Sequence, residues 1–234
     1  MTPLRIGLRS CRELALPAAA LLSAGTALVV AYYHVPPVTS ALARVGELKR
    51  SAGIGFPVFS GMLLSGLVPW LFRMALPALR PARPLAELLF GLLWWAPMIV
   101  IVDAFYRLLG HLLDGLGWPV AALVCAKVCL DMFVFTALFA SPANALAHLW
   151  KDLGFDLRRL RSNLRPGWYS RLVLPNLVPN YMVWFPGVTL VYAMPADLQL
   201  PMANLIGCFW ALMCLQIAAN SRSRLAPAET AVPA

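Results

Sequence analysis

The chain has 234 residues, of which 61% are hydrophobic and only 12% are charged. A soluble domain of this length cannot bury so much apolar surface, so we expect an all-α, polytopic transmembrane helix bundle with five to six spans. The net charge of +9 comes from basic residues in short segments between apolar runs. That distribution is typical of loops beside anionic lipid headgroups and argues against a nucleic-acid partner.

Apolar runs of the length that crosses a bilayer as a helix, about 20 residues, recur along the chain. Prolines and polar or basic residues separate them. A single membrane domain, residues 1–234, is therefore expected, with spans at 14–35, 54–74, 85–109, 119–141, 172–194 and 200–219.

Prolines shape the first two spans. Two consecutive prolines after Val35 end the first span and lead into a polar connection over residues 38–53. In the second span, Pro69 has no backbone N–H and leaves the carbonyl of Ser65 without its usual partner, so we expect a kink there. Gly61 and Ser65 form a small-xxx-small pair, which lets another helix approach closely.

The third span carries a carboxylate and a guanidinium four residues apart, at Asp103 and Arg107. Residues four apart lie on one face of a helix, so these side chains can form an ion pair. Arg107 lies near the end of the span, where a long side chain can reach the membrane interface. The short Asp103 side chain cannot, so it is a candidate for a polar path. A turn from Asp114 to Gly117 leads into the fourth span.

The fourth span contains Lys127 and Asp131 near its middle. Their spacing of four predicts that ammonium and carboxylate neutralise each other inside the bundle. Ionisable residues at this depth usually face the bundle interior or a wet cavity, so the pair is a candidate functional site. An ion pair that only fixes helix packing is the alternative.

Residues 147–165 have a different character, because leucines recur every three or four residues while arginines occupy the other faces. This pattern predicts one interfacial amphipathic helix among the headgroups, with a solvated connecting helix as the alternative. The span over 172–194 contains three prolines, so we expect its first half to be irregular. Residues 220–234 should form a disordered tail.

Basic residues are distributed unevenly over this topology. Fourteen of the 19 lysines and arginines fall on one side, four fall on the other, and Lys127 lies within a span. The positive-inside rule therefore predicts that both termini are cytoplasmic. We expect the inner (cell) membrane of a bacterium, with a mitochondrial or other organelle membrane as the alternative.

The sequence shows no pattern that points to catalysis. The histidines His34, His111 and His148 are isolated at span ends, so we expect no metal site. No nucleophile-base constellation or phosphate-binding glycine loop is visible, and we therefore expect no cofactor and no enzymatic activity.

Several residues follow one another in a recognisable order. Lys127 and Asp131 precede an apolar run, and upstream and downstream landmarks are Ala96-Pro97, Phe105-Tyr106, Asn180-Tyr181, Trp184-Phe185-Pro186, Met194-Pro195 and Trp210. In these residues the chain resembles the family of the Mpv-seventeen mitochondrial inner-membrane protein and the twenty-two-kilodalton peroxisomal membrane protein. The resemblance covers roughly residues 54–219. It implies a small multi-span protein, in a family for which pore or channel activity and a part in membrane and redox homeostasis have been proposed.

Two functions agree with these features. The first is a small channel or solute-permeation protein, in which Asp103, Arg107, Lys127 and Asp131 line or gate a polar path. The second is a non-conducting membrane scaffold or interaction protein. The resemblance adds structural candidates: Pro97, Tyr106, Asn180, Trp184, Pro186, Pro195 and Trp210. The expected partners are the lipid bilayer and its anionic headgroups, and a homo-oligomer is a further option.

Overall fold

The computed structural model describes residues 3–229, with the side chains of residues 11–216 and 218, and over that range it contains helices but no β-strand. Helical segments that are long and apolar enough to cross a membrane number five in this range: Cys11–His34, Gly55–Ala75, Pro84–Leu116, Val120–Asp152 and Ala196–Gln216. This confirms the predicted class, an all-α polytopic membrane protein.

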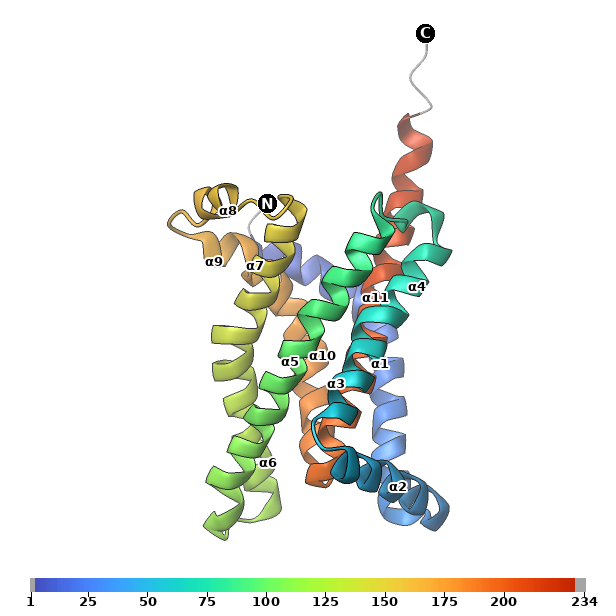
Figure 1. The fold of residues 1–234 in the computed structure, drawn as a ribbon, viewed down its shortest axis with the longest axis vertical. Coiled ribbons are helices and arrows are strands. Elements are labelled where there is room, and N and C mark those ends of the chain that lie inside the picture. Colours follow the sequence, from blue (N-terminus) through green and yellow to red (C-terminus); the bar gives the residue numbers. More distant parts are fainter. Residues whose placement is uncertain (1–2, 230–234) are drawn as a thin grey trace.

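The first half of the chain runs back and forth along the long axis of the molecule (Figure 1). Its elements are α1 (Pro3–His34), α2 (Pro36–Ala52), α3 (Gly55–Gly61), a π-helical segment η1 (Met62–Leu67), α4 (Val68–Ala75), a 3₁₀ turn (Pro77–Leu79) and α5 (Pro84–Leu113). The polar connection expected over residues 38–53 is helical, because α2 fills it between the first two candidate spans. Pro36 takes its first position, where no N–H is needed.

The second half begins with a tight turn and a long helix. Its elements are the 3₁₀ turn Asp114–Leu116, α6 (Val120–Cys129), a π-helical segment η4 (Leu130–Ala140), α7 (Ser141–Asp152), α8 (Leu157–Asn163), α9 (Trp168–Leu172), α10 (Leu174–Tyr192) and α11 (Ala196–Glu229). One end of the molecule holds the start of α1, α8 and the last turns of α11, and the opposite end holds α2 (Figure 1).

Both π-helical segments precede a proline. In η1 the N–H of Val68 donates to the carbonyl of Leu63, and in η4 the N–H of Ser141 donates to the carbonyl of Thr136. These bonds reach five residues back, and the wider turn lets the helix continue past Pro69 and past the proline after Ser141. The fourth span therefore does not end at residue 141 as expected, and the helix continues to residue 152.

The single amphipathic helix expected over residues 147–165 is wrong. Gly154 adopts a left-handed φ of 70°, and the next residue, Phe155, follows with a φ of 64°. The N–H of Phe155 donates to Trp150 O and that of Gly154 to Lys151 O, while the Phe155 ring packs on Trp150 with centroids 5.1 Å apart. These contacts are a Schellman cap, which ends α7. Asp156 then caps the separate helix α8 by accepting from the N–H groups of its first turn.

Two further expectations, both for the C-terminal part of the chain, are wrong. α10 is a continuous helix with Pro179 and Pro186 inside it, so the expected irregular first half of 172–194 is wrong. Pro175, Pro179 and Pro186 are spaced by four and seven residues, which confines the missing N–H groups to one face. α11 continues to Glu229, so the expected disordered tail is wrong from 220 to 229, and residues 230–234 lie outside the described residues.

α10 packs against elements from both halves of the chain. It contacts α1, α6, η4 and α11, and Val183 and Val191 on it are fully buried. Its prolines and asparagines make it less apolar than the five membrane-spanning candidates, although it also runs along the bundle (Figure 1). It therefore provides the inner wall against which a polar site can form.

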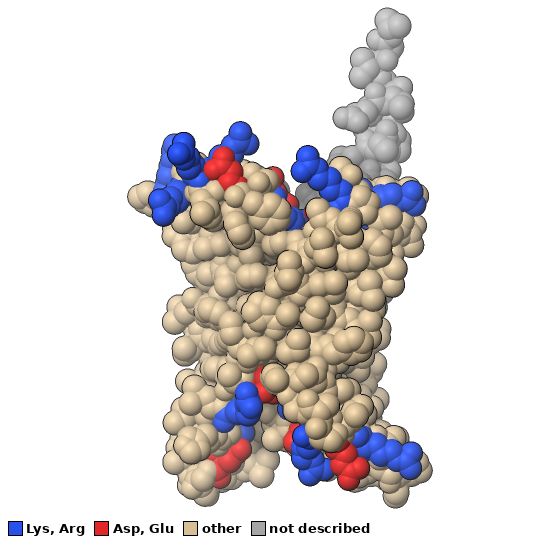
Figure 2. Space-filling model, in the orientation of Figure 1, with Lys and Arg blue, Asp and Glu red and all other residues tan. Residues whose placement is uncertain are grey.

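The surface of the molecule has an uncharged middle. Charged side chains gather at its two ends and a band without them lies between (Figure 2). Large apolar residues such as Leu93, Phe133 and Leu138 are exposed. In water such a band would be unfavourable, but in lipid it is the expected outer face.

Candidate functional site

A cavity of 480 Å³ lies between α4, α5, α7, α10, α11 and the two π-helical segments. Its volume falls in the usual range of small-molecule sites, about 300–1,000 Å³. Aromatic side chains form much of its wall, among them Phe90, Trp95, Tyr106, Phe135, Trp184 and Trp210. The cavity extends from Arg73 and Glu87, near one end of the bundle, to Asp131 on η4.

Asp131 is the charged group deepest in this cavity, and its side chain is held by neutral donors. The hydroxyl of Tyr192 donates to Oδ2 at 2.8 Å, and that of Thr136 donates to Oδ1 at 3.2 Å. Thr136 stands five residues after Asp131, and the π-helical turn brings them together. Tyr181 on α10 also donates to the carbonyl of Met132 at 2.9 Å. Two tyrosines of α10 therefore fix η4 beside the cavity.

The predicted ion pair between Lys127 and Asp131 is wrong. Lys127 Nζ lies 2.6 Å from Asp114 Oδ1, in the turn between α5 and α6. Side chains on a helix tilt toward its N-terminus, so Lys127 points away from Asp131 and toward that turn. Lys127 remains buried, and its ammonium lies 6.0 Å from the centre of the Tyr192 ring.

The predicted pair between Asp103 and Arg107 is confirmed, with Arg107 Nη2 3.0 Å from Asp103 Oδ2. A second cation, Lys49 on α2, lies 3.4 Å from Oδ1 of the buried Asp103 carboxylate. Neither Asp103 nor Arg107 lines the cavity. The four proposed polar-path residues therefore do not lie at one site. Of the four, only Asp131 lines the cavity.

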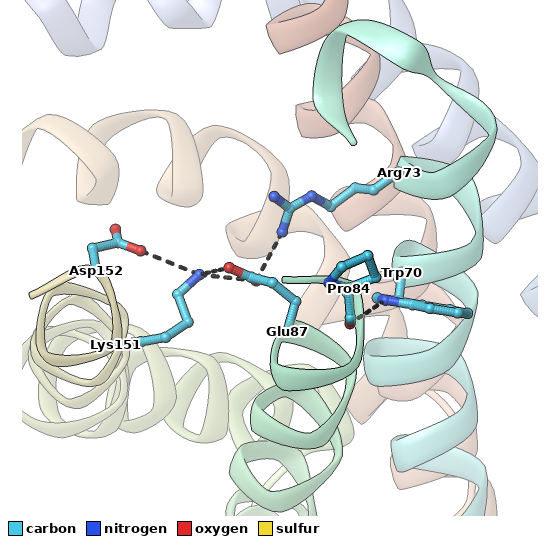
Figure 3. Close-up of polar contacts among 6 residues, drawn as sticks. All are labelled: Trp70, Arg73, Pro84, Glu87, Lys151 and Asp152. Carbon is cyan, nitrogen blue, oxygen red and sulfur yellow. Dashed lines mark hydrogen bonds and ion pairs between the residues drawn. The ribbon is translucent and has the colours of Figure 1, made fainter. Parts of the chain in front are cut away.

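The other end of the cavity is bordered by an ion-pair network that the sequence analysis missed. Glu87 on α5 lies between Arg73 of α4 and Lys151 of α7 (Figure 3), at 3.0 Å and 2.8 Å. Lys151 also contacts Asp152 at 3.2 Å, so two cations and two carboxylates balance. All four residues lie near helix ends. That position was the sequence feature from which the network could have been predicted. The network joins three helices at one mouth of the cavity.

Some of the residues that carry the family resemblance line the cavity, and others do not. Tyr106, Asn180, Trp184 and Trp210 line the cavity together with Asp131. Asn180 Oδ1 is buried and has no hydrogen-bond partner among the described residues. The three prolines of the pattern lie elsewhere: Pro97 inside α5, Pro186 inside α10 and Pro195 before α11. Four landmarks from three helices, α5, α10 and α11, thus line one site.

Polar contacts continue from the cavity to the opposite end of the bundle. They run from Asp131 to Tyr192, from the Tyr192 ring to Lys127, and from Lys127 to Asp114. We call these four residues the polar column. No group of three His, Cys, Asp or Glu residues suited to a metal ion occurs in the described part of the chain. The arrangement can bind or pass a polar solute between helices.

Fold and surface together define a helical membrane protein with an aromatic-walled internal cavity. Comparison of the chain with protein-family models, curated proteins and solved structures found no match.

Proposed function

We propose that the chain is a small channel or solute-permeation protein and that the central cavity is its path. The observation that carries this proposal is the buried carboxylate of Asp131, which lines a cavity between membrane-spanning helices. Such a group is costly in lipid and is typical of solute pathways. The cavity and the polar column provide consecutive polar positions from Glu87 to Asp114.

Membership of the Mpv-seventeen family is part of the same proposal. Tyr106, Asn180, Trp184 and Trp210 were selected for their order in the sequence, and all four line one cavity. A shared site explains why these residues form one pattern although they come from three helices, α5, α10 and α11. We extend the proposal to a role in membrane homeostasis without enzymatic chemistry, in a bacterial inner membrane or an organelle membrane.

A non-conducting scaffold is the second candidate, and specific contacts favour it. Asp103, Arg107 and Lys127 all pair outside the cavity, where their ion pairs join helices to one another or to a turn. The arginines of α8 lie at the end of the molecule (Figure 1), where they suit anionic headgroups. In that case the cavity would be an incidental packing defect.

Potassium chloride conductance of planar bilayers that contain the purified full chain separates the two candidates. Gly207 lines the cavity, and the atoms nearest to a Cβ placed there belong to Trp184, at 3.6 Å, and Ser65, at 3.9 Å. We expect Gly207→Leu to fill the path and lower the conductance. Gly55→Leu is the matched control, because a Cβ at Gly55 meets nothing within 4 Å. A parent that conducts no better than protein-free bilayers would favour the scaffold.

A further inference from the structure

Asp131 differs from the other charged residues of the cavity in having no ionic partner. Arg73, Glu87 and Asp131 are the lysine, arginine, aspartate or glutamate side chains that line it, and Arg73 pairs with Glu87. Asp131, which is 5% exposed, pairs with no cation among the described side chains. Its carboxylate is compensated by the hydrogen bonds from Tyr192 and Thr136, so a bound cation would supply the charge partner that these neutral donors do not provide.

Three of the donors that line the cavity are already bound to the protein. Trp70 Nε1 donates to Pro84 O at 2.8 Å, and Asn204 Nδ2 donates to Ser60 Oγ at 3.2 Å. The guanidinium of Arg73 is bound to Glu87. Asn180 Oδ1, by contrast, is a buried acceptor that nothing described satisfies. A ligand with a positive charge and N–H donors would match both Asp131 and this acceptor.

The aromatic walls suit the same kind of ligand. Trp95, Trp184 and Trp210 line the cavity with Tyr106 and Phe135. Indole and phenyl faces attract cations, and they also pack against hydrocarbon. A buried carboxylate at one end of such walls matches an ammonium group attached to an apolar body.

We propose that the cavity binds a small organic cation, an alkylammonium whose charged group faces Asp131. Asn180 supplies a second acceptor, and the tryptophans enclose the hydrocarbon part. This inference rests on the proposed function, because it names the class of solute that the same cavity admits. Inorganic cations fit less well, since a strongly hydrated ion gains little from apolar walls.

Binding of cyclohexylammonium to the purified full chain in detergent tests the proposal. The probe carries N–H donors, a positive charge and an apolar ring, and cyclohexanol is its uncharged analogue. Thermal unfolding is followed at constant ionic strength, adjusted with sodium chloride. A ligand that binds only the folded state raises the Tm as its concentration exceeds its Kd. We expect a saturable rise with cyclohexylammonium and none with cyclohexanol at the same concentrations.

Three variants localise the site. Asp131→Asn keeps the size of the side chain and removes its charge, so the Kd for cyclohexylammonium should rise about tenfold or more. Asp103→Asn removes an equally buried carboxylate outside the cavity and should leave this Kd unchanged. Asn180→Leu removes an unsatisfied acceptor, so we expect a Tm no lower than that of the parent and a Kd several-fold higher. If Asp131→Asn does not fold, the site is tested by the Kd for cyclohexylammonium in Asn180→Leu, compared with the Kd in Asp103→Asn.

An equal response to cyclohexanol, or an unchanged Kd in Asp131→Asn, would overturn the proposal. So would an unchanged Kd in Asn180→Leu where Asp131→Asn fails to fold. Conductance separates this outcome from failure of the proposed function. Potassium chloride conductance without cyclohexylammonium binding would leave a permeation path that is not selective for organic cations. Binding at Asp131 without any conductance would leave a ligand site in a protein that is not a channel.

Discussion

Lys127 and Asp131 stand one helical turn apart, and each finds its partner in a different direction. The long lysine side chain extends toward the α5–α6 turn, where Asp114 is half exposed and can keep contact with water. The short Asp131 side chain cannot extend in this way and is satisfied sideways by Tyr192 and Thr136. Side-chain length and the tilt of the Cα–Cβ bond therefore decide between partners that sequence spacing alone treats as equal.

A double-mutant cycle tests this assignment. Tyr192→Phe removes the donor and Asp131→Leu removes the acceptor of one buried hydrogen bond, so their effects on the free energy of unfolding should couple by about 0.5–3 kcal/mol. The cycle of Lys127→Met with Asp131→Leu should give a clearly smaller coupling energy. Chemical unfolding of the purified variants measures both. A larger coupling between Lys127 and Asp131 than between Tyr192 and Asp131 would restore the ion pair that the structure excludes.

At the scale of elements, five of the six expected spans overlap the helices that are apolar and long enough to cross a membrane, because a run of about 20 apolar residues is a strong signal; the expected span 172–194 is not among them. The short turn after Asp114 and the pair Asp103–Arg107 were also predictable, since both depend on local spacing. The breaks were harder to locate. Gly154 could have predicted the end of one helix, and Asp156 the beginning of the next. The periodic leucines on both sides suggested one continuous helix instead.

The cavity could not be predicted in the same way. Its lining comes from five α-helices and two π-helical segments, and their packing depends on contacts far apart in the sequence. Glu87 illustrates this: its partner Lys151 is 64 residues away. Asp131 was identified from its depth in a span, but its partner Tyr192 became visible only in the fold. Local spacing therefore identified Asp131, the one polar-path candidate that lines the cavity, but predicted the wrong partner for it, Lys127.

Close packing of η1 and α3 on α5 leads to a prediction at the same scale. A Cβ placed at Gly61 would overlap Cγ1 of Ile99, so Gly61→Ala should force the helices apart. We expect a loss of about 1–3 kcal/mol in the free energy of unfolding. Gly55→Ala, where a Cβ meets nothing within 4 Å, is the control. Equal stability of the two variants would show that α3 and α5 do not approach this closely.

Charged side chains gather at the two ends of the molecule, and an uncharged band lies between them (Figure 2). α8 and the last turns of α11 lie at one end, and α2 lies at the other (Figure 1). Because basic residues are more numerous at the first end, reporter fusions after Arg161 and after Asn220 should both be cytoplasmic. A fusion after Glu47 should be external. A cytoplasmic reporter at Glu47 would contradict both the orientation and the role of α1 as a membrane span.

The central claim is that solutes pass through the cavity, and Cys214 allows a direct measurement because it lines that cavity. In a variant with the other four cysteines replaced by alanine, conductance is recorded before and after reaction with a charged, membrane-impermeant methanethiosulfonate. Mass spectrometry determines the extent of modification. We predict that water-borne reagent reaches Cys214 and that conductance falls as modification proceeds. Complete modification with unchanged conductance, or a Cys214 that the reagent never reaches, would contradict the claim.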